Sequence, residues 1–291
     1  MRLSIIAALL GLALAGGQLR AQTPAAITSD PLADKTFLPS LLGITVPSHG
    51  TDMDATLYLA GGAGPHGTVL LLHGLPGYEA NGDLAQSMRR AGWNVLLFNY
   101  RGTWGTPGMF TQSSAIEDTA EAVRFLLDPA AVSKYRIDPR RLVLVGHSFG
   151  AFLAGYEASH NAEIMAAAMI SAPNLGQINS NPQEREIRLK RWEAQLHPVR
   201  GSTASELFAE AQMHGKDWDY IAWADALRRH QILLIAADDQ NRSDMQALAT
   251  ALRHKKADRL DYVAVPTDHS FSDHRIALQT IVLAWLEKLG K

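Results

Sequence analysis

The chain has 291 residues, of which 47% are hydrophobic and 19% charged, with a formal net charge of −2 and no cysteine. This length and composition predict an ordinary globular protein with one large domain and a substantial buried core. The lack of cysteine excludes disulfides, thiolate catalysis and cysteine zinc sites, and no concentrated run of Lys and Arg indicates a nucleic-acid partner.

The first residues have the pattern of a cleavable export signal. Arg2 precedes an apolar run from Leu3 to Ala15, and small residues follow this run. The run is too short to span a bilayer comfortably, so we expect a signal peptide at residues 1–21 rather than a stable membrane anchor. Cleavage is expected after Ala21, with Ala15 as the alternative site, and the mature protein is expected in the periplasm or outside the cell.

Strands and helices alternate along the rest of the chain. Residues 22–42 are rich in Pro, Ala, Ser and Asp and predict an exposed lead-in before a domain at 43–291. Short apolar runs predict strands, and an apolar residue at every third or fourth position predicts a helix. The pattern predicts strands at 43–46, 55–60, 68–72, 95–100, 141–145, 166–171, 232–236 and 260–265, with helices at 84–91, 114–127, 148–159 and 272–289.

The alternation breaks between residues 174 and 229, which are polar, helical in period and without a strand-like run. Such a stretch is too long for a loop in a compact domain, so we expect an inserted helical cap. The alternation as a whole predicts an α/β fold with a mostly parallel central sheet flanked by helices. In sheets of this kind, ligands bind at the carboxyl ends of the strands.

The strongest local signal is Gly146-His147-Ser148-Phe149-Gly150, which directly follows a predicted buried strand and precedes a predicted helix. In this Gly-x-Ser-x-Gly context, the serine lies on a tight turn that projects its hydroxyl from the edge of the sheet. Larger side chains at the two flanking glycines would collide with neighbouring backbone. Ser148 is therefore the candidate nucleophile, and the alternative is that it only caps the helix.

A serine hydroxyl needs a general base at neutral pH. His269 follows the last predicted strand, so its loop leaves the sheet at the same edge as Ser148. His274, one turn into the final predicted helix, is the weaker candidate, and the adjacent His147 should point away from Ser148.

The base in turn needs a carboxylate that holds its tautomer and stabilises its cation. Asp238 and Asp239 both lie just past the strand predicted at 232–236. Asp239 fits the usual distance past the strand better, and Asp238 remains open. The alternative is that both acids only cap the following helix.

Acyl transfer also needs backbone N–H groups that stabilise the oxyanion of the transition state. One should come from Phe149, the residue after the nucleophile. The second should come from Leu75, in the His73–Gly77 loop that follows the strand predicted at 68–72.

A further loop, residues 99–108, follows another predicted strand end, and its Tyr100 and Trp104 are candidates for lining a substrate pocket. The histidines are scattered, without a His-x-x-x-His pair, and neither a phosphate-binding loop nor a dinucleotide-binding fingerprint is present. We therefore expect no metal and no cofactor.

Taken together, the segment from Pro47-Ser48-His49-Gly50 to the run at residues 267–273 resembles secreted bacterial α/β-hydrolases, of the kind described as prolyl-oligopeptidase-like or dienelactone-hydrolase-like. The resemblance covers nearly the whole mature chain and is weakest at 174–229. It implies the α/β-hydrolase fold and a catalytic serine, aspartate and histidine, which match Ser148, Asp239 or Asp238, and His269.

These observations predict a serine hydrolase that cleaves a carboxylic ester or related acyl bond of a small molecule through an acyl-enzyme. A peptidase that uses the same triad on short peptides is an alternative. It would need acidic residues in the cap to hold the substrate's amine, and helical spacing places most glutamates of the cap on solvated faces. The alternative of another class is a non-catalytic binding protein on the same scaffold. The sequence leaves the oligomeric state open.

Overall fold

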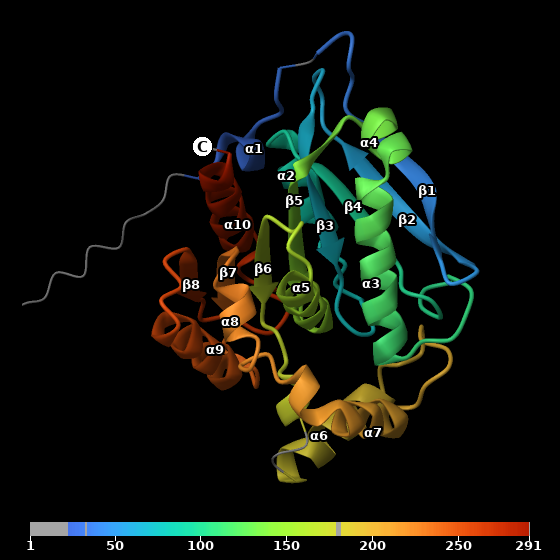
Figure 1. The fold of residues 1–291 in the computed structure, drawn as a ribbon, viewed down its shortest axis with the longest axis vertical. Coiled ribbons are helices and arrows are strands. Elements are labelled where there is room, and N and C mark those ends of the chain that lie inside the picture. The colour runs from blue at the N-terminus through green and yellow to red at the C-terminus, as the bar shows by residue number, and fades with distance from the viewer. Residues whose placement is uncertain (1–22, 33, 179–181, 291) are drawn as a thin grey trace, which may run out of the picture.

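An eight-stranded sheet with helices on both faces forms the centre of the molecule (Figure 1). The structure is a computed structural model that describes residues 23–32, 34–178 and 182–290, so the predicted signal peptide lies outside the described residues. In chain order the strands are β1 (Ser40–Ser48), β2 (Thr51–Leu59), β3 (His66–Leu72), β4 (Asn94–Phe98), β5 (Ile137–His147), β6 (Ala166–Ile170), β7 (Gln231–Ala236) and β8 (Leu260–Ala264).

The strands follow the order β1-β2-β4-β3-β5-β6-β7-β8 across the sheet. All neighbouring pairs from β4 to β8 are parallel, and β2 runs antiparallel to both of its neighbours. The predicted mostly parallel sheet is therefore confirmed. Because parallel strands end at one edge of the sheet, the loops after β3, β5, β7 and β8 converge there.

Helices cover both faces of this sheet. In chain order they are α1 (Ala25–Thr28), α2 (Gly82–Arg90), α3 (Gln112–Leu127), α4 (Pro129–Tyr135), α5 (Phe149–His160), α6 (Pro182–Glu193), α7 (Ala204–His214), α8 (Ala224–Leu227), α9 (Arg242–His254) and α10 (Arg275–Leu289), with 3₁₀ turns η1 (Leu175–Gln177) and η2 (Gly215–Trp218). Apolar residues of α3, α5 and α9 form one core cluster with the sheet, and those of α2 and α10 form the other. Within the described residues, no helix is both long and apolar enough to cross a membrane.

The second half of strand β5, residues 142–145, shows why a buried strand has a continuous apolar run. Successive side chains of a strand point to opposite faces of the sheet, so Leu142 and Leu144 join one core cluster while Val143 and Val145 join the other. All four side chains are buried. A strand covered on both faces needs apolar residues at every position, and this strand leads directly to Ser148.

The predicted lead-in at 22–42 is wrong in part. β1 already begins at Ser40 and pairs with β2, and the short α1 packs near α2, where the Nε of Arg90 donates a hydrogen bond to the carbonyl of Ala26 at 2.5 Å. Composition does not reveal either contact, because β1 depends on pairing with the next strand and Ala26 on a residue 64 positions away.

The structure also contains α4, which the sequence analysis missed. Helix α3 ends at Leu127, as predicted, and Asp128-Pro129 then starts the next helix. The carboxylate of Asp128 accepts hydrogen bonds from the N–H groups of Ala130 and Ala131, and Pro129 occupies the first turn, where its missing N–H costs nothing.

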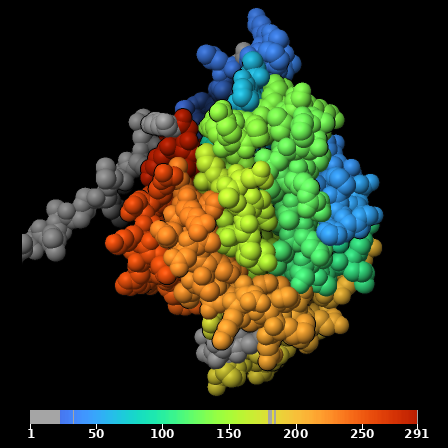
Figure 2. All heavy atoms as spheres, in the orientation of Figure 1, coloured from blue at the N-terminus to red at the C-terminus, as the bar shows by residue number. Residues whose placement is uncertain are grey.

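The segment between β6 and β7 carries η1, α6, α7, η2 and α8, and no strand of the sheet falls among its described residues. Figure 2 shows its orange part covering one end of the molecule. The carboxylate of Glu210 on α7 accepts hydrogen bonds from the N–H groups of Gln112 and Ser113, at 2.8 and 2.9 Å. These two groups start α3, so the insertion is fastened to the sheet domain by a helix cap.

Candidate active site

Ser148 joins β5 to α5 in a backbone conformation that few residues other than glycine adopt, with φ 57° and ψ −123°. A Cβ atom on Gly146 would lie 2.0 Å from the carbonyl oxygen of Gly150, and one on Gly150 would lie 2.1 Å from that of Leu72. Both neighbours must therefore be glycine. The side chain of Ser148 makes no capping hydrogen bond to α5, so the alternative role as a helix cap is wrong.

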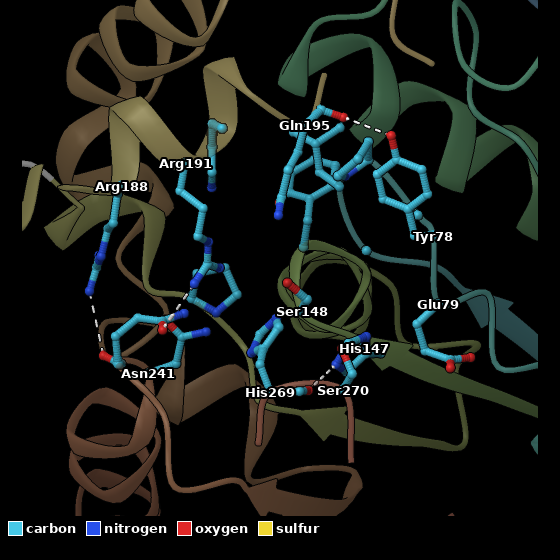
Figure 3. Close-up of a pocket in the computed structure, with 18 of the residues that line it drawn as sticks. Tyr78, Glu79, His147, Ser148, Arg188, Arg191, Gln195, Asn241, His269 and Ser270 are labelled. Carbon is cyan, nitrogen blue, oxygen red and sulfur yellow. Dashed lines mark hydrogen bonds between the residues drawn. The ribbon is translucent and has the colours of Figure 1, made fainter. Parts of the chain in front are cut away.

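A buried carboxylate and a histidine meet beside this turn. The Nδ1 of His269 donates a hydrogen bond to the Oδ2 of Asp239 at 2.6 Å. A carboxylate only accepts, so the proton sits on Nδ1 and leaves the lone pair on Nε2. His269 and Ser148 line the same cavity, and Figure 3 shows the His269 ring directed toward the Ser148 side chain.

The structure separates the alternatives that the sequence left open. Asp238 points to the surface and forms an ion pair with Arg242, whereas Asp239 contacts His269. His274 pairs with the exposed carboxylate of Asp273 and is not among the residues that line the cavity. Of the two acids and two histidines, Asp239 and His269 are the pair that lies beside the serine.

The environment of Asp239 favours its ionised form. Burial alone would raise the pKa of this carboxyl, but the hydrogen bond from His269, the electrostatic interaction with that ring and the N–H of Asn241 outweigh burial and hold the pKa below its usual value. Asp239 therefore stays charged at neutral pH, as an acid that orients a histidine requires.

His147 has a role that the sequence analysis missed. Its Nε2 donates a hydrogen bond to the backbone carbonyl of His269 at 2.7 Å, and the two rings lie 4.9 Å apart. Burial lowers the pKa of His147 to about 3, so its ring is neutral. His147 thus holds the loop of the candidate base from the turn that carries Ser148. The position of His147 in the Gly-x-Ser-x-Gly turn could have indicated this contact, because the loop after β8, which carries His269, is predicted to reach the same edge of the sheet.

Both predicted oxyanion donors lie at the cavity. Leu75 and Phe149 are among its lining residues, together with Gly74 and Ser148. Phe149 is the first residue of α5, and the first N–H groups of a helix have no acceptor within the helix. The partial positive charge at this helix start also favours an anion.

The predicted pocket role of Tyr100 is wrong. Its side chain is fully buried, packs 4.5 Å from the His73 ring, and donates a hydrogen bond from its hydroxyl to the His73 carbonyl at 2.9 Å. Tyr100 therefore supports the loop that carries Leu75 from behind. The prediction that Tyr100 lies at this edge of the sheet is correct, but its side chain points into the core rather than into the cavity.

The predicted pocket role of Trp104 needs the same correction. Its Nε1 donates a hydrogen bond to the carbonyl of Pro76 at 2.6 Å, and its ring meets that of Tyr78 edge to face at 5.3 Å. Tyr78 lines the cavity, whereas Trp104 does not. Trp104 therefore braces the rim of the cavity without forming its wall.

The cavity itself has a volume of about 240 Å³ and lies between the strand ends and the insertion. Residues of α6 form one of its walls, opposite the loop that follows β3. Among the described residues, no group of three or more His, Asp and Glu side chains is arranged to hold a metal ion.

A mostly parallel sheet with a strained serine turn after one strand, and an aspartate and a histidine joined after two later strands, is the arrangement that defines the α/β hydrolases. The family comparison agrees. The profile described as "Alpha/beta hydrolase family" matches residues 69–280, more than half of the chain, so the protein belongs to the alpha/beta hydrolase family.

Solved structures with the same fold include an acylaminoacyl peptidase of Pyrococcus horikoshii, with a TM-score of 0.66 and 16% identity over 87% of this chain. The chain corresponds to 42% of that peptidase. An esterase of Pyrobaculum calidifontis has a TM-score of 0.62 and 16% identity, with 86% of each chain covered. An esterase of Pyrococcus furiosus has a TM-score of 0.62 and 17% identity, covering 87% of this chain and 91% of that chain.

A curated relative, an uncharacterized protein of Mycobacterium tuberculosis, is 34% identical over 98 residues. This match spans 33% of the chain and 32% of the relative, about a third of each.

Proposed function

We propose that the protein is a serine hydrolase that cleaves a carboxylic ester, or a related acyl bond, through an acyl-enzyme on Ser148. The observation that carries this proposal is the partly buried hydrogen bond between Asp239 and His269 beside the strained serine turn. A nucleophile, an acid and a base in this chain order, at three strand ends, have the arrangement needed for acyl transfer.

In the proposed first step, the Oγ of Ser148 attacks the carbonyl carbon of the ester while the Nε2 of His269 takes the hydroxyl proton. The resulting imidazolium is stabilised by the ionised Asp239. The carbonyl oxygen becomes an oxyanion that accepts hydrogen bonds from the N–H groups of Leu75 and Phe149.

The tetrahedral intermediate then collapses. The bond to the alcohol breaks, and His269 returns the proton to the leaving oxygen, so the alcohol departs neutral and Ser148 keeps the acyl group. Water enters next, gives its proton to His269 and attacks the acyl carbon. The bond to the Oγ of Ser148 then breaks and His269 returns the proton to that oxygen, which releases the carboxylic acid and restores the serine.

The charged residues of the insertion favour an ester over a peptide with a free amino group. Glu206 caps α7, Glu210 caps α3, and Glu186 pairs with Lys190 on the surface. None of these glutamates is among the described residues that line the cavity. The cap wall therefore offers a peptide's ammonium group no carboxylate from these positions.

The test is a pair of assays on the purified mature protein and its Ser148→Ala variant. One assay uses p-nitrophenyl esters of graded chain length, and the other uses aminoacyl-p-nitroanilides. We expect ester turnover that the variant loses, while Ser133→Ala, an exposed change on α4, retains it. Anilide turnover that depends on Ser148 would favour the peptidase instead. If neither substrate turns over and a fluorophosphonate does not label Ser148, the proposed function is wrong.

We also propose that the chain is exported after removal of residues 1–21. The support is the basic and apolar pattern of these residues in the sequence. The N-terminal sequence of the protein recovered from the periplasm or the medium of an expressing bacterium tests this proposal. We expect it to begin at Gln22, and an uncleaved N-terminus in the cytoplasm would contradict export.

A further inference from the structure

One face of α6 forms the cap wall of the cavity. Arg188, Arg191, Trp192 and Gln195 all line it, at spacings of three, four and seven residues from the first. These spacings bring side chains to the same face of a helix, and Gln195 continues the stripe just past the helix end. Two of the four residues carry a guanidinium group, so this wall is positively charged.

The two guanidinium groups lie beside the loop that carries the triad acid. The Nη2 of Arg188 donates to the backbone carbonyl of Gln240, and the Nη1 of Arg191 donates to its Oε1, both at 3.4 Å. Both acceptors are uncharged, and both hydrogen bonds are long. Among the described residues, Arg191 has no carboxylate within ion-pair distance. Its charge is therefore available to a bound molecule.

The opposite wall carries Glu79, the one acidic side chain among the described residues that line the cavity. Its Oε1 accepts a hydrogen bond from the N–H of Asn81 at 2.7 Å and lies 3.7 Å from the Nη2 of Arg275. Glu79 therefore has charged and polar partners on its own side. Figure 3 shows Arg188 and Arg191 on one side of Ser148 and Glu79 on the other.

We propose that the substrate is a short ester that also carries a carboxylate, which Arg191 and Arg188 bind while Ser148 attacks the ester carbonyl. Guanidinium groups suit this task because their planar donors match the two oxygens of a carboxylate. The cavity of about 240 Å³ limits the substrate to a small molecule. This inference rests on the proposed function and adds the substrate class to it.

The experiment compares matched charged and neutral esters. The carboxylate on the acyl side is tested with mono-4-nitrophenyl adipate against 4-nitrophenyl hexanoate. The carboxylate on the alcohol side is tested with 4-carboxyphenyl acetate against 4-carbamoylphenyl acetate. In each pair we measure the ratio of kcat/KM for the charged ester to that for the neutral ester, after subtracting spontaneous hydrolysis.

We expect the wild-type protein to prefer the charged ester in at least one pair by about tenfold, and Arg191→Gln to remove most of this preference. Arg188→Gln should lower the preference as well, and added salt should weaken it. Lys190→Gln is the matched control, because it removes one positive charge from the same helix at a position that does not line the cavity. Gln has a helix propensity close to that of Arg and Lys, so all three variants keep α6.

Two results overturn the inference: a charged-to-neutral ratio near one in both pairs, or a preference that survives in Arg191→Gln and Arg188→Gln alike. Failure of the proposed function is a different result, namely no Ser148-dependent turnover of any ester. In that case calorimetry measures the binding of monomethyl adipate to the Ser148→Ala variant, which tests the carboxylate site without turnover. Binding that Arg191→Gln weakens by about tenfold supports the site, and equal or absent binding overturns it.

Discussion

Two buried histidines beside the candidate active site should make the folded protein sensitive to acid. Burial lowers the pKa of His147 to about 3. Burial also lowers the pKa of His73 to about 4, against the opposing effect of its hydrogen bond to the Gly74 carbonyl. In the unfolded chain both imidazoles return to their ordinary pKa of about 6.5. The unfolded state therefore binds protons that the folded state does not.

The sign and size of the effect follow from this difference. The folded pKa of each base is depressed, so stability is fully present above about pH 6.5 and is lost as the pH falls toward the folded pKa. A pH of about 5 lies about 1.5 units below the unfolded pKa. Between about pH 7.5 and about pH 5, each histidine therefore lowers the free energy of unfolding by about 2 kcal/mol. Together they remove about 4 kcal/mol, a large share of the roughly 5–15 kcal/mol that stabilises a typical domain.

The assay is urea unfolding at these two pH values for the wild type, His73→Gln and His147→Gln. Only the difference between the two pH values is compared, so a general loss of stability in either variant cancels. Each variant should reduce the pH-dependent loss by about 2 kcal/mol, whereas His254→Gln, at the exposed end of α9, should leave it unchanged. A wild-type loss below about 1 kcal/mol, or variants that keep the full loss, would refute the reasoning.

The remaining predictions concern the site and its supports. Asp239→Asn should lower kcat on p-nitrophenyl acetate by about a thousandfold or more, because the amide no longer holds the imidazole proton on Nδ1, whereas the exposed Asp238→Asn should stay within about twofold. Equal kcat values in these two variants would remove Asp239 from its proposed role. Gly150→Ala places a methyl group 2.1 Å from the carbonyl oxygen of Leu72 and should cost more than about 3 kcal/mol in urea unfolding. Tyr100→Phe removes the hydrogen bond to the oxyanion loop and should cost about 1 kcal/mol while lowering kcat/KM, and unchanged values of both would show that this bond is dispensable.

The strands and the catalytic candidates were accessible from the sequence because their signals are local. A stretch of strand buried on both faces must be apolar at every position, as Leu142–Val145 of β5 is, and the turn at Ser148 demands glycine at 146 and 150 whatever surrounds it. His269 and Asp239 needed one further step, that parallel strands end at a common edge. The choice between Asp239 and Asp238 needed side-chain direction, which a sequence does not contain.

The wrong and missing predictions share one physical origin: the position of each side chain depends on contacts with residues distant in the chain. Tyr100 faces the core rather than the cavity because the His73 carbonyl and ring lie behind it, 27 residues away in the chain. The hydrogen bond from His147 to the His269 carbonyl spans 122 residues. The polar, helical pattern of the insertion predicted helices there, but it did not indicate which face of α6 would meet Ser148.

The insertion has a consequence for how such a protein can change over time. Its α6 stripe reaches the cavity from a stretch of chain that contributes no strand of the sheet among its described residues. A substitution at Arg188 or Arg191 therefore changes the wall of the cavity without changing any residue of the strands that end at Ser148, Asp239 and His269. Natural variation and laboratory libraries can therefore change this wall through one helix while the sheet and its strand ends keep their sequence.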